Sequence, residues 1–444
     1  QWSDHLFTAG YEYDNIEIFN LFVAFSQGEA SFDSLADFQN QTPSSIFYAN
    51  YFTNDPADGA ASFDNTIHTL YAQDTYTGIP DVTLTAGLRI DMYSTDDTPT
   101  SNPRVQQRYG IPNDQNFDGK SIIQPRIAFD WQVDDRTTLF GGFGIFSGGN
   151  PFVFLSNSYS NTGFLGSTFE TDPSIINGFN GFDIPTQMQA DVAASGSIGD
   201  GFVNFIDPNF EIPQVRRWAL GGTYNADLSD WGMGDDWLFG VDFLYSETED
   251  PFLFQQANLV VVGRAPDGRP IYAAQDLLDP DCPEVLNAGT FSGNCSSRSG
   301  GSGDGDFFLT NSNQTPDAFT FSTYVNKDWD FEKLDIDMTL GYAYTDAEEV
   351  SPLTSSRAIS NFENFSTSDF NNPVPATANS EVEQRFTARV TFDYEWKPEW
   401  NTRFTFFGQL NEGRPFSYTF DTPFGDGNPL SGGNLFGDSD ASED

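Results

Sequence analysis

The segment that decides the fold is FTARVTFDYEW at residues 386–396. Every second residue from Phe386 to Trp396 is apolar, whereas the residues between them are Thr, Arg, Asp or Glu. A period of two places the two sets on opposite faces of a β-strand. One wholly apolar face and one charged or hydroxylated face suit a strand that separates lipid from a wet interior.

The same alternation recurs in VTLTAGLRIDMY at residues 82–93 and in LDIDMTLGYAYT at residues 334–345. Nine further candidates are residues 5–13, 16–25, 66–77, 121–133, 137–146, 215–226, 237–247, 319–329 and 402–410. No apolar run approaches the roughly 18 residues of a membrane helix. We therefore expect an all-β protein with about twelve membrane-crossing strands.

The connections between these segments alternate between short turns and long loops. Short turns are expected at residues 14–15, 78–81, 134–136, 227–236, 330–332 and 397–401, and long loops at residues 27–64, 93–119, 147–212, 248–317 and 346–382. A transmembrane antiparallel β-barrel has short turns on the periplasmic side and long loops outside. We interpret residues 1–444 as one partial barrel domain in the outer membrane of a Gram-negative bacterium.

Two local elements are expected in the first long loop. Ser45–Tyr51 looks extended, but as a membrane strand it would break the alternation of turns and loops, so we place it outside the membrane. Residues 31–39 predict a short helix, because Ser34 can cap it and Leu35 and Phe38 recur at helical spacing.

Tryptophan positions give a second indication of a barrel. Six of the eight tryptophans lie in or near the predicted short turns: Trp131, Trp231, Trp237, Trp329, Trp396 and Trp400. Amphipathic rings favour the boundary between membrane and water. Tryptophans that mark hairpin ends in any β protein are the alternative.

Charge and motifs exclude several functions. The chain carries 65 acidic and 19 basic residues, a formal net charge of −46, so the basic footprint of a nucleic-acid-binding protein is missing. His5 and His68 are far apart, and no nucleophile elbow, zinc signature or P-loop occurs, so we do not expect an enzyme. We expect five lumen-facing arginines to neutralise acidic groups across the wall or to contact a plug: Arg89, Arg126, Arg217, Arg389 and Arg403.

The long loops carry a few candidate sites. Cys282 and Cys295 predict a disulfide in an exported loop, with free thiols or a metal pair as alternatives. Asp114, Asn116 and Asp118 match the start of a calcium loop. Because the twelfth position is a proline, an EF-hand is excluded, and an Asx-rich turn is the alternative. Calcium is the only candidate cofactor. In another loop, Asp304-Gly305-Asp306 predicts a solvated segment.

The loop at residues 147–212 is rich in aromatic residues. Its candidates for a recognition surface are Phe152, Phe154, Tyr159 and Phe164. The alternative is that these rings fold the loop onto its neighbours, since so long a loop must bury side chains to be ordered.

Several short motifs resemble those of TonB-dependent outer-membrane receptors. YAQDTY at residues 71–76 resembles the family's Y-x-Q-D-x-aromatic strand, and LTAGLRID at residues 84–91 resembles its L-T-x-G-L-R-x-D strand. QPRIAF at residues 124–129 resembles the family's x-P-R-x-x-F strand, and GRPFSY at residues 413–418 is similar to the end of a later strand. Residues 146–163 resemble the Oar-like subgroup in particular.

The resemblance implies a 22-stranded barrel, a plug domain inside it, and uptake energised by the TonB complex of the inner membrane. This chain departs from that pattern, because it has about twelve predicted strands, no residues before Gln1 and an acidic end without a closing strand. We therefore expect part of a barrel wall in outer-membrane lipid, with the plug outside this chain.

The expected function is uptake of a large or scarce substrate captured by the extracellular loops. Two alternatives stay open on the same scaffold. One is a component for protein export or surface assembly, whose partner would be a secreted or surface protein. The other is an adhesin whose barrel only displays loops.

Overall fold

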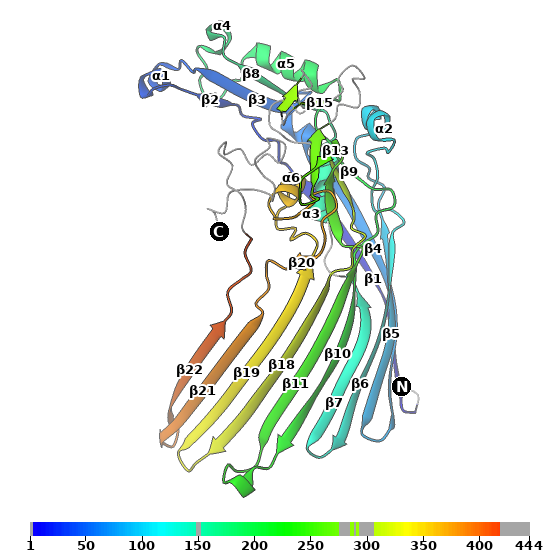
Figure 1. Ribbon diagram of the computed structural model, residues 1–444, viewed down its shortest axis with the longest axis vertical. Coiled ribbons are helices and arrows are strands. Elements are labelled where there is room, and N and C mark those ends of the chain that lie inside the picture. The colour runs from blue at the N-terminus through cyan, green and yellow to red at the C-terminus, as the bar shows by residue number, and fades with distance from the viewer. Residues whose placement is uncertain (1–2, 148–151, 275–284, 288–289, 293–305, 418–444) are drawn as a thin grey trace.

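The computed structural model describes residues 3–147, 152–274, 285–287, 290–292 and 306–417. Its main element is one curved antiparallel sheet (Figure 1). Eleven long strands lie side by side in this order: β1 (His5–Asn20), β4 (Ala61–Ile79), β5 (Val82–Ser94), β6 (Ser121–Asp134), β7 (Thr137–Phe146), β10 (Gln214–Ala226), β11 (Trp237–Glu249), β18 (Asp317–Asp330), β19 (Leu334–Glu349), β21 (Gln384–Lys397) and β22 (Trp400–Asn411). The short strand β20 (Ala376–Thr377) pairs with β19 and is the twelfth. Within the described part, β1 and β22 do not pair with each other, so the barrel wall is open.

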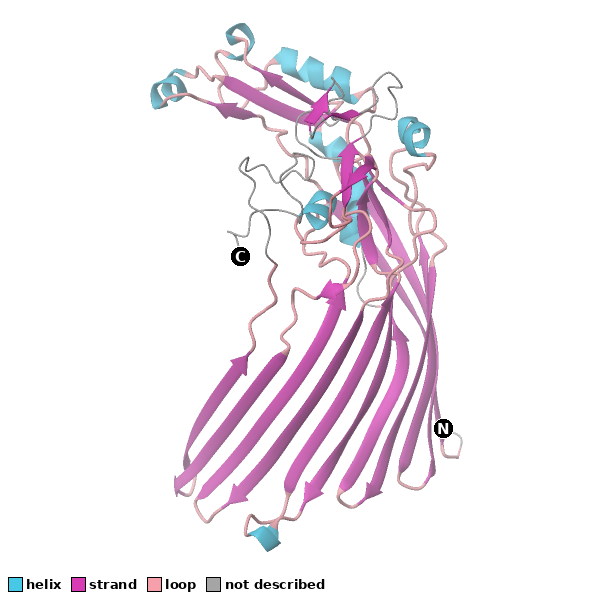
Figure 2. Ribbon diagram, viewed as in Figure 1, coloured by secondary structure: helices cyan, strands magenta, loops and turns pink. Residues whose placement is uncertain are grey.

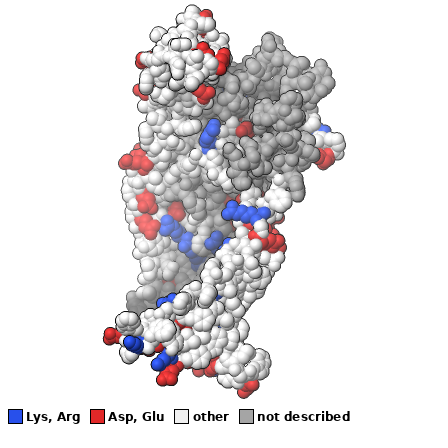
Figure 3. All heavy atoms as spheres, turned by 90° about the vertical axis from the view of Figure 1, so that its left-hand side faces the viewer, with Lys and Arg blue, Asp and Glu red and all other residues white. Residues whose placement is uncertain are grey.

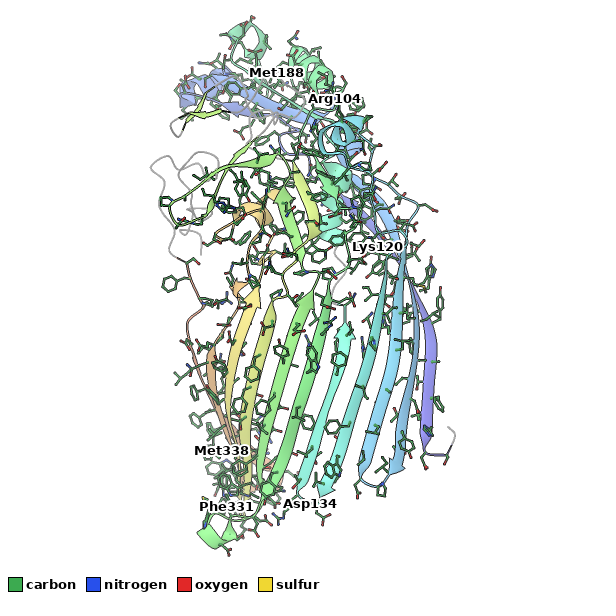
Figure 4. All side chains as sticks on the ribbon, turned by 45° about the vertical axis from the view of Figure 1, so that its right-hand side comes forward. Arg104, Lys120, Asp134, Met188, Phe331 and Met338 are labelled. Carbon is green, nitrogen blue, oxygen red and sulfur yellow. The ribbon has the colours of Figure 1, made fainter. Side chains whose placement is uncertain are left out.

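The alternation of short turns and long loops is confirmed, with one exception. Five of the six predicted turns join neighbouring strands at one end of the sheet, and all five long loops leave from the other end (Figure 1). In Figure 4, Asp134 and Phe331 lie at the short-turn end, and Arg104 and Met188 lie at the loop end. Among the described residues, no helix is long and apolar enough to cross a membrane.

The turn predicted at Asp14 and Asn15 is wrong. Strand β1 runs without interruption through both residues, and its partners on β4 continue in register from His5 opposite Tyr76 to Asn20 opposite Ala61. Asn15 Oδ1 accepts a hydrogen bond of 2.9 Å from Thr66 Oγ1, so its side chain bonds to the paired strand β4 instead of forming a turn. The turn preference of an Asp-Asn pair is overridden by the pairing of the strand. Two predicted strands are therefore one.

The two faces of the wall differ as the alternation predicts. Leu88, Leu220 and Phe243 point outward and stay exposed, which suits lipid. Ile67 and Ile122 point to the other side and are buried in a core formed by the loops. That core lies within the curve of the sheet (Figure 2), so this side is the inner face of the wall.

The long loops fold into a layer of small sheets and helices above the wall (Figure 2). One sheet joins β2 (Glu29–Ser31), β3 (Ser45–Tyr51) and β8 (Leu165–Glu170), and another joins β9 (Asn204–Ile206), β12 (Phe252–Gln256) and β17 (Phe307–Asn311). Two hairpins are β13 (Leu259–Arg264) with β14 (Pro270–Ala274) and β15 (Val285–Asn287) with β16 (Thr290–Ser292). The helices are α1 (Leu35–Asn40), α2 (Pro103–Tyr109), α3 (Phe152–Ser160), α4 (Pro173–Ile176), α5 (Thr186–Gly196), α6 (Ala358–Glu363) and the 3-10 turn η1 (Pro56–Gly59).

Both elements expected in the first loop are present. Strand β3 is the predicted extended segment, and it lies in the loop layer rather than in the wall. Helix α1 begins after Ser34, whose side chain accepts a hydrogen bond from the Asp37 backbone N–H. The hydroxyl satisfies one of the free N–H groups of the first turn, as expected for a helix cap.

The largest of three hydrophobic clusters joins the long loops to one another. Its buried residues come from all five predicted long loops, for example Phe63, Phe117, Phe210, Phe307 and Phe362. Phe117 and Phe210 stack with their ring centres 5.4 Å apart, although 93 positions separate them in the sequence. The loops are therefore one folded unit that rests on the inner face of the wall.

The six tryptophans predicted at the short-turn end lie there. Trp231 is in the 3-10 turn η2 (Ser229–Trp231) between β10 and β11, and Trp400 begins β22. Trp237 and Trp329 are in edge contact across β11 and β18, with ring centres 5.7 Å apart. Tryptophans gathered at one end of the sheet suit the boundary between membrane and water.

Candidate functional site

The inner face of the wall carries an ion-pair network near the loop layer. Arg89 contacts Glu12 at 3.0 Å and Asp91 at 2.9 Å, and Nη2 donates to Thr69 Oγ1 at 3.2 Å. The Asp91 carboxylate also accepts from Thr69 Oγ1 and from Gln124 Nε2, each at 2.6 Å. The partners come from β1, β4, β5 and β6, so the network joins four consecutive wall strands below the loop core.

The predicted lumen arginines divide into two groups. Arg89 is neutralised in the network above, and Arg403 contacts Asp393 at 2.6 Å, as expected. Arg126, Arg217 and Arg389 have no carboxylate partner among the described residues, so for these three both neutralisation and contact with a plug stay predictions. Figure 3 shows Lys and Arg side chains gathered at mid-height in the hollow of the molecule.

A recess of about 630 Å³ lies in the wall beside two of these arginines. Arg126 Cζ lies 4.4 Å and Arg217 Cζ 5.6 Å from the ring centre of Phe146. Arg126 Nη2 also donates to Gln124 Oε1 at 3.2 Å. The lining includes Arg89, Arg126, Arg217, Phe146, Tyr71 and Gln73.

A second recess, of about 260 Å³, lies in the loop layer. Its wall is aromatic at Phe22, Phe25 and Phe47 and polar along α3, with Ser156 and Asn157. The Asn157 side-chain amide is already hydrogen-bonded to another loop, since its Nδ2 donates to Ser356 O at 2.8 Å. Arg357, whose Cζ lies 5.7 Å from the ring centre of Phe22, adds a positive charge to this lining.

The aromatic residues proposed for recognition lie inside the loop layer. Phe152 and Tyr159 are buried in the common core, and the Tyr159 ring stacks on Phe63 with centres 4.1 Å apart. Phe154 packs against Phe252 at 5.4 Å, and Phe164 lies 6.0 Å from Phe52. These contacts agree with the alternative that the rings fold the loop. Direct recognition by these four rings stays a prediction.

The predicted calcium residues form a turn in which two side chains are already hydrogen-bonded. Asn116 Oδ1 accepts from the Asp118 N–H at 3.0 Å, and Asn116 Nδ2 donates to Asp97 O at 2.8 Å. Asp118 Oδ1 accepts from the Thr95 N–H at 3.2 Å. Within the described part of the chain, no three His, Cys, Asp or Glu side chains converge as metal ligands. Calcium binding by Asp114, Asn116 and Asp118 stays a prediction.

The predicted disulfide cannot be placed, because Cys282 and Cys295 lie outside the described residues. The same holds for Asp304. Asp306, however, is described, and it is buried rather than solvated. That part of the expectation for residues 304–306 is wrong, and the reason is a charge partner supplied by another loop.

Arg108 and Asp306 form a buried ion pair between two long loops. Arg108 Nη1 contacts Asp306 Oδ2 at 2.9 Å, and the two side chains are 1% and 7% exposed. Arg108 also contacts the half-buried Asp200 at 3.2 Å, while the Val203 N–H donates to Asp306 Oδ1 at 3.0 Å. Tyr109 adds a hydrogen bond to the same carboxylate. Because the partners are 198 positions apart, no local sequence signal predicts this pair.

At the opposite end, Arg136 joins two of the short turns. Its guanidinium contacts both carboxylate oxygens of Asp235, at 2.7 and 2.9 Å, and Nη1 also donates to Asn225 O at 3.2 Å. Hydrogen bonding from Arg136, with a second bond from the Asp236 N–H, lowers the pKa of Asp235 to about 2. The turn after β6 is thereby fixed to the turn after β10.

This turn contact predicts a pH dependence with a definite sign. A lowered pKa stabilises the ionised folded form, so the contribution is complete above about pH 4, the ordinary pKa of aspartate, and is lost as the pH falls through about 2. We expect the melting temperature of Arg136→Gln to lie below that of the wild type by a constant amount from about pH 7 to 4. The difference should disappear near pH 2. A difference that already disappears between about pH 7 and 5 would contradict the assignment.

The comparison with protein families identifies the chain. Residues 1–225 match the model of a family described as outer membrane beta barrel domain, which is more than half of the 444 residues. The chain therefore belongs to this family of outer-membrane β-barrel domains, and its place is the outer membrane of a Gram-negative bacterium.

Several solved structures are similar in fold to this chain. They include the outer membrane transporter YddB from Escherichia coli, at 12% identity and a TM-score of 0.48, over 94% of this chain and 40% of that one. The FrpB iron transporter from Neisseria meningitidis (F5-1 variant) has 11% identity and a TM-score of 0.41, over 92% and 41%. The siderophore receptor PirA from Pseudomonas aeruginosa has 11% identity and a TM-score of 0.37, over 91% and 50%. The chain thus spans at most half the length of these structures, and no curated protein matches it.

Proposed function

We propose that this chain is part of the barrel wall of a TonB-dependent outer-membrane receptor that takes up a large or scarce solute. The observation that carries the proposal is the asymmetry of the wall: one end has only short turns, while the other supports a folded layer built from five loops. Such a layer suits capture at the cell surface, and the polar inner face below it suits passage. Three of the motifs that resemble the receptor family lie on the consecutive strands β4, β5 and β6, whereas residues 413–417 follow the end of β22.

Closure of the barrel follows from the physics of the bilayer. The free edges of β1 and β22 would leave backbone N–H and C=O groups unsatisfied in lipid, which costs several kcal/mol per group. We propose that further strands close the wall to about 22 in the complete receptor and that a plug seals the wide lumen. Since the outer membrane has no energy source of its own, movement of the plug needs work from a partner such as the TonB complex.

Membership of the Oar-like subgroup is a finer part of the proposal. Its support is the segment at residues 146–163, which resembles that subgroup in sequence. The described part of this segment forms α3 and contributes Phe152, Leu155 and Tyr159 to the loop core. The resemblance therefore falls on residues that build the loop layer.

The function is tested by nutrient depletion. We expect a strain that lacks the gene, and a strain that lacks the inner-membrane TonB protein, to leave the same solute in the medium that the wild type depletes. Reintroducing the full-length gene should restore depletion in the first strain only. Depletion at wild-type rates in the gene-deleted strain would overturn the proposal. Loss of a secreted protein together with normal depletion would instead favour the export component.

The orientation of the wall is tested by proteolysis of intact cells. We expect a protease added outside to cut only within the long loops, because the short turns face the periplasm. The turn at Asp134 and Arg136 should be cut only after the outer membrane is permeabilised. Cleavage at that turn in intact cells would refute the topology.

A further inference from the structure

We propose that the recess beside Phe146 binds an anionic solute, whose carboxylate, sulfate or phosphate groups are held by Arg126 and Arg217. The inference rests on the proposed function, because a solute reaches the inner face only if it enters the barrel. It goes beyond that function by naming the chemistry that the wall recognises.

The first argument is the charge balance around these two arginines. The chain has 65 acidic residues against 19 basic ones, so carboxylates are abundant. On the same face, Arg89 and Arg403 each contact a carboxylate within 3.0 Å. Arg126 and Arg217 are exposed and have no such contact among the described residues. Within the described part of the wall, these two cations share one recess without a carboxylate partner, whereas Arg389, which also lacks one, lies on the distant strand β21.

The second argument is the position of the two guanidinium groups. Arg126 and Arg217 lie opposite the same residue, Gly144, on the two sides of β7, so their side chains project from one row of the sheet. Both lie beside the Phe146 ring, and cation–π contact favours this placement. Two like charges held side by side repel each other, and a bound anion would remove that repulsion.

Gly144 is what allows the Phe146 ring to lie there. A Cβ at position 144 would be 2.8 Å from Phe146 Cε2 and 3.1 Å from Arg126 Cγ. A side chain would therefore push the ring and the arginine stem away from the wall. The glycine lets Phe146 fold back against its own strand, where it holds the two cations in place.

The third argument is that, in the described part of the chain, Arg126 and Arg217 still have free N–H donors and that the recess beside them is large enough for a solute. An arginine has five N–H donors in a planar fork that matches an oxyanion. Arg126 uses one bond to Gln124, and no hydrogen bond of Arg217 is seen among the described residues. The recess of about 630 Å³ lies within the usual size of small-molecule sites, about 300–1,000 Å³. A ring on the solute could in addition stack on Phe146 or Tyr71.

The probe is benzene-1,3,5-tricarboxylate, which combines a ring with three oxyanion groups. Its neutral counterpart is 1,3,5-tris(hydroxymethyl)benzene, which has the same ring and no charge. Each is titrated by calorimetry into the purified full-length protein in a non-ionic detergent at low salt. We expect one site for the tricarboxylate, weaker binding as salt is added, and no binding of the neutral compound.

Variants locate the site. The double variant R126Q/R217Q should bind the tricarboxylate at least about tenfold more weakly, since two charge-assisted contacts are lost. Gly144→Val should also weaken binding, although both charges remain. Arg403→Gln is the matched control on the same face, and it should bind as the wild type does. Melting curves of every variant show whether it is folded.

Three results would overturn the inference. The neutral compound could bind as well as the tricarboxylate, R126Q/R217Q could bind as tightly as the wild type, or the tricarboxylate could fail to bind. In the last case, destabilisation of the full-length protein by R126Q/R217Q would indicate an acidic protein segment on the arginines. Binding is measured without TonB, so an uptake defect and a binding defect are independent outcomes.

Discussion

Replacing Arg108 by methionine is expected to destabilise the loop layer by about 3–5 kcal/mol. The substitution leaves the Asp306 carboxylate buried without its cation, and an uncompensated buried charge is far more costly than a lost surface contact. Among the described residues, the Asp306 carboxylate then keeps only the Val203 N–H and the Tyr109 hydroxyl as partners. The wall strands should stay assembled, because the ion pair connects loops above them.

The measurement is hydrogen exchange of the full-length protein, with limited proteolysis on intact cells as a second readout. Both should show faster opening of the segments around Arg108, Val203 and Asp306, while β18 and β19 keep their protection. Arg104→Met is the matched control on the same helix. Arg104 contacts Asp200 at 3.0 Å, but both side chains are more than one-third exposed, so the loss should stay below about 1 kcal/mol.

Equal effects of the two substitutions would contradict the assignment of a buried pair. A further variant separates burial of charge from loss of packing. Replacing both Arg108 and Asp306 by apolar residues removes the unpaired charge, so it should be less destabilising than R108M alone. If the double replacement is the worse of the two, the pair contributes net attraction beyond its desolvation cost.

Leu220→Arg is expected to prevent assembly of the barrel in the outer membrane. Leu220 is 55% exposed on the outer face of β10, where its neighbours across the ladder are Gly141 and Phe243. An arginine on the lipid face near the bilayer midplane costs about 2–4 kcal/mol. The variant should therefore accumulate as unfolded or degraded protein rather than in the outer-membrane fraction.

Ala219→Arg is the control for this prediction, because position 219 is adjacent in sequence and faces the interior. A charge there meets water and should leave the amount of assembled protein nearly unchanged. The readout is the folded fraction in isolated outer membranes, compared for both variants at equal expression. If Ala219→Arg blocks assembly and Leu220→Arg does not, the inner and outer faces are assigned the wrong way round.

The sequence predicted the wall well because each residue of a strand between lipid and water must suit the side that it faces. The resulting alternation of apolar and polar residues is visible in the sequence itself. The alternation at residues 82–93, 334–345 and 386–396 appears in β5, β19 and β21 with the expected faces. The error at Asp14 and Asn15 has a physical cause. Local turn preference is weak, and sixteen consecutive pairs with β4 outweigh it.

The loop layer was much less predictable. The Ser34 cap is a local signal, and it correctly located α1. The contacts of Phe117 with Phe210, and of Arg108 with Asp306, join segments that the sequence shows only as separate loops. The same limit applies to the recess, because the row of Arg126, Gly144 and Arg217 depends on the register of three strands.

The largest core of the loop layer, shared by five loops, has a consequence for how the exposed surface can evolve. Core positions are coupled across five loops, so a substitution at Phe117 or Phe362 disturbs segments far from it. Helix α1 contributes no buried residue, and the Phe182 ring is 84% exposed. Such loop tips can change in sequence without disturbing the core. Sequence differences between related proteins should therefore concentrate there, while the core positions change only together.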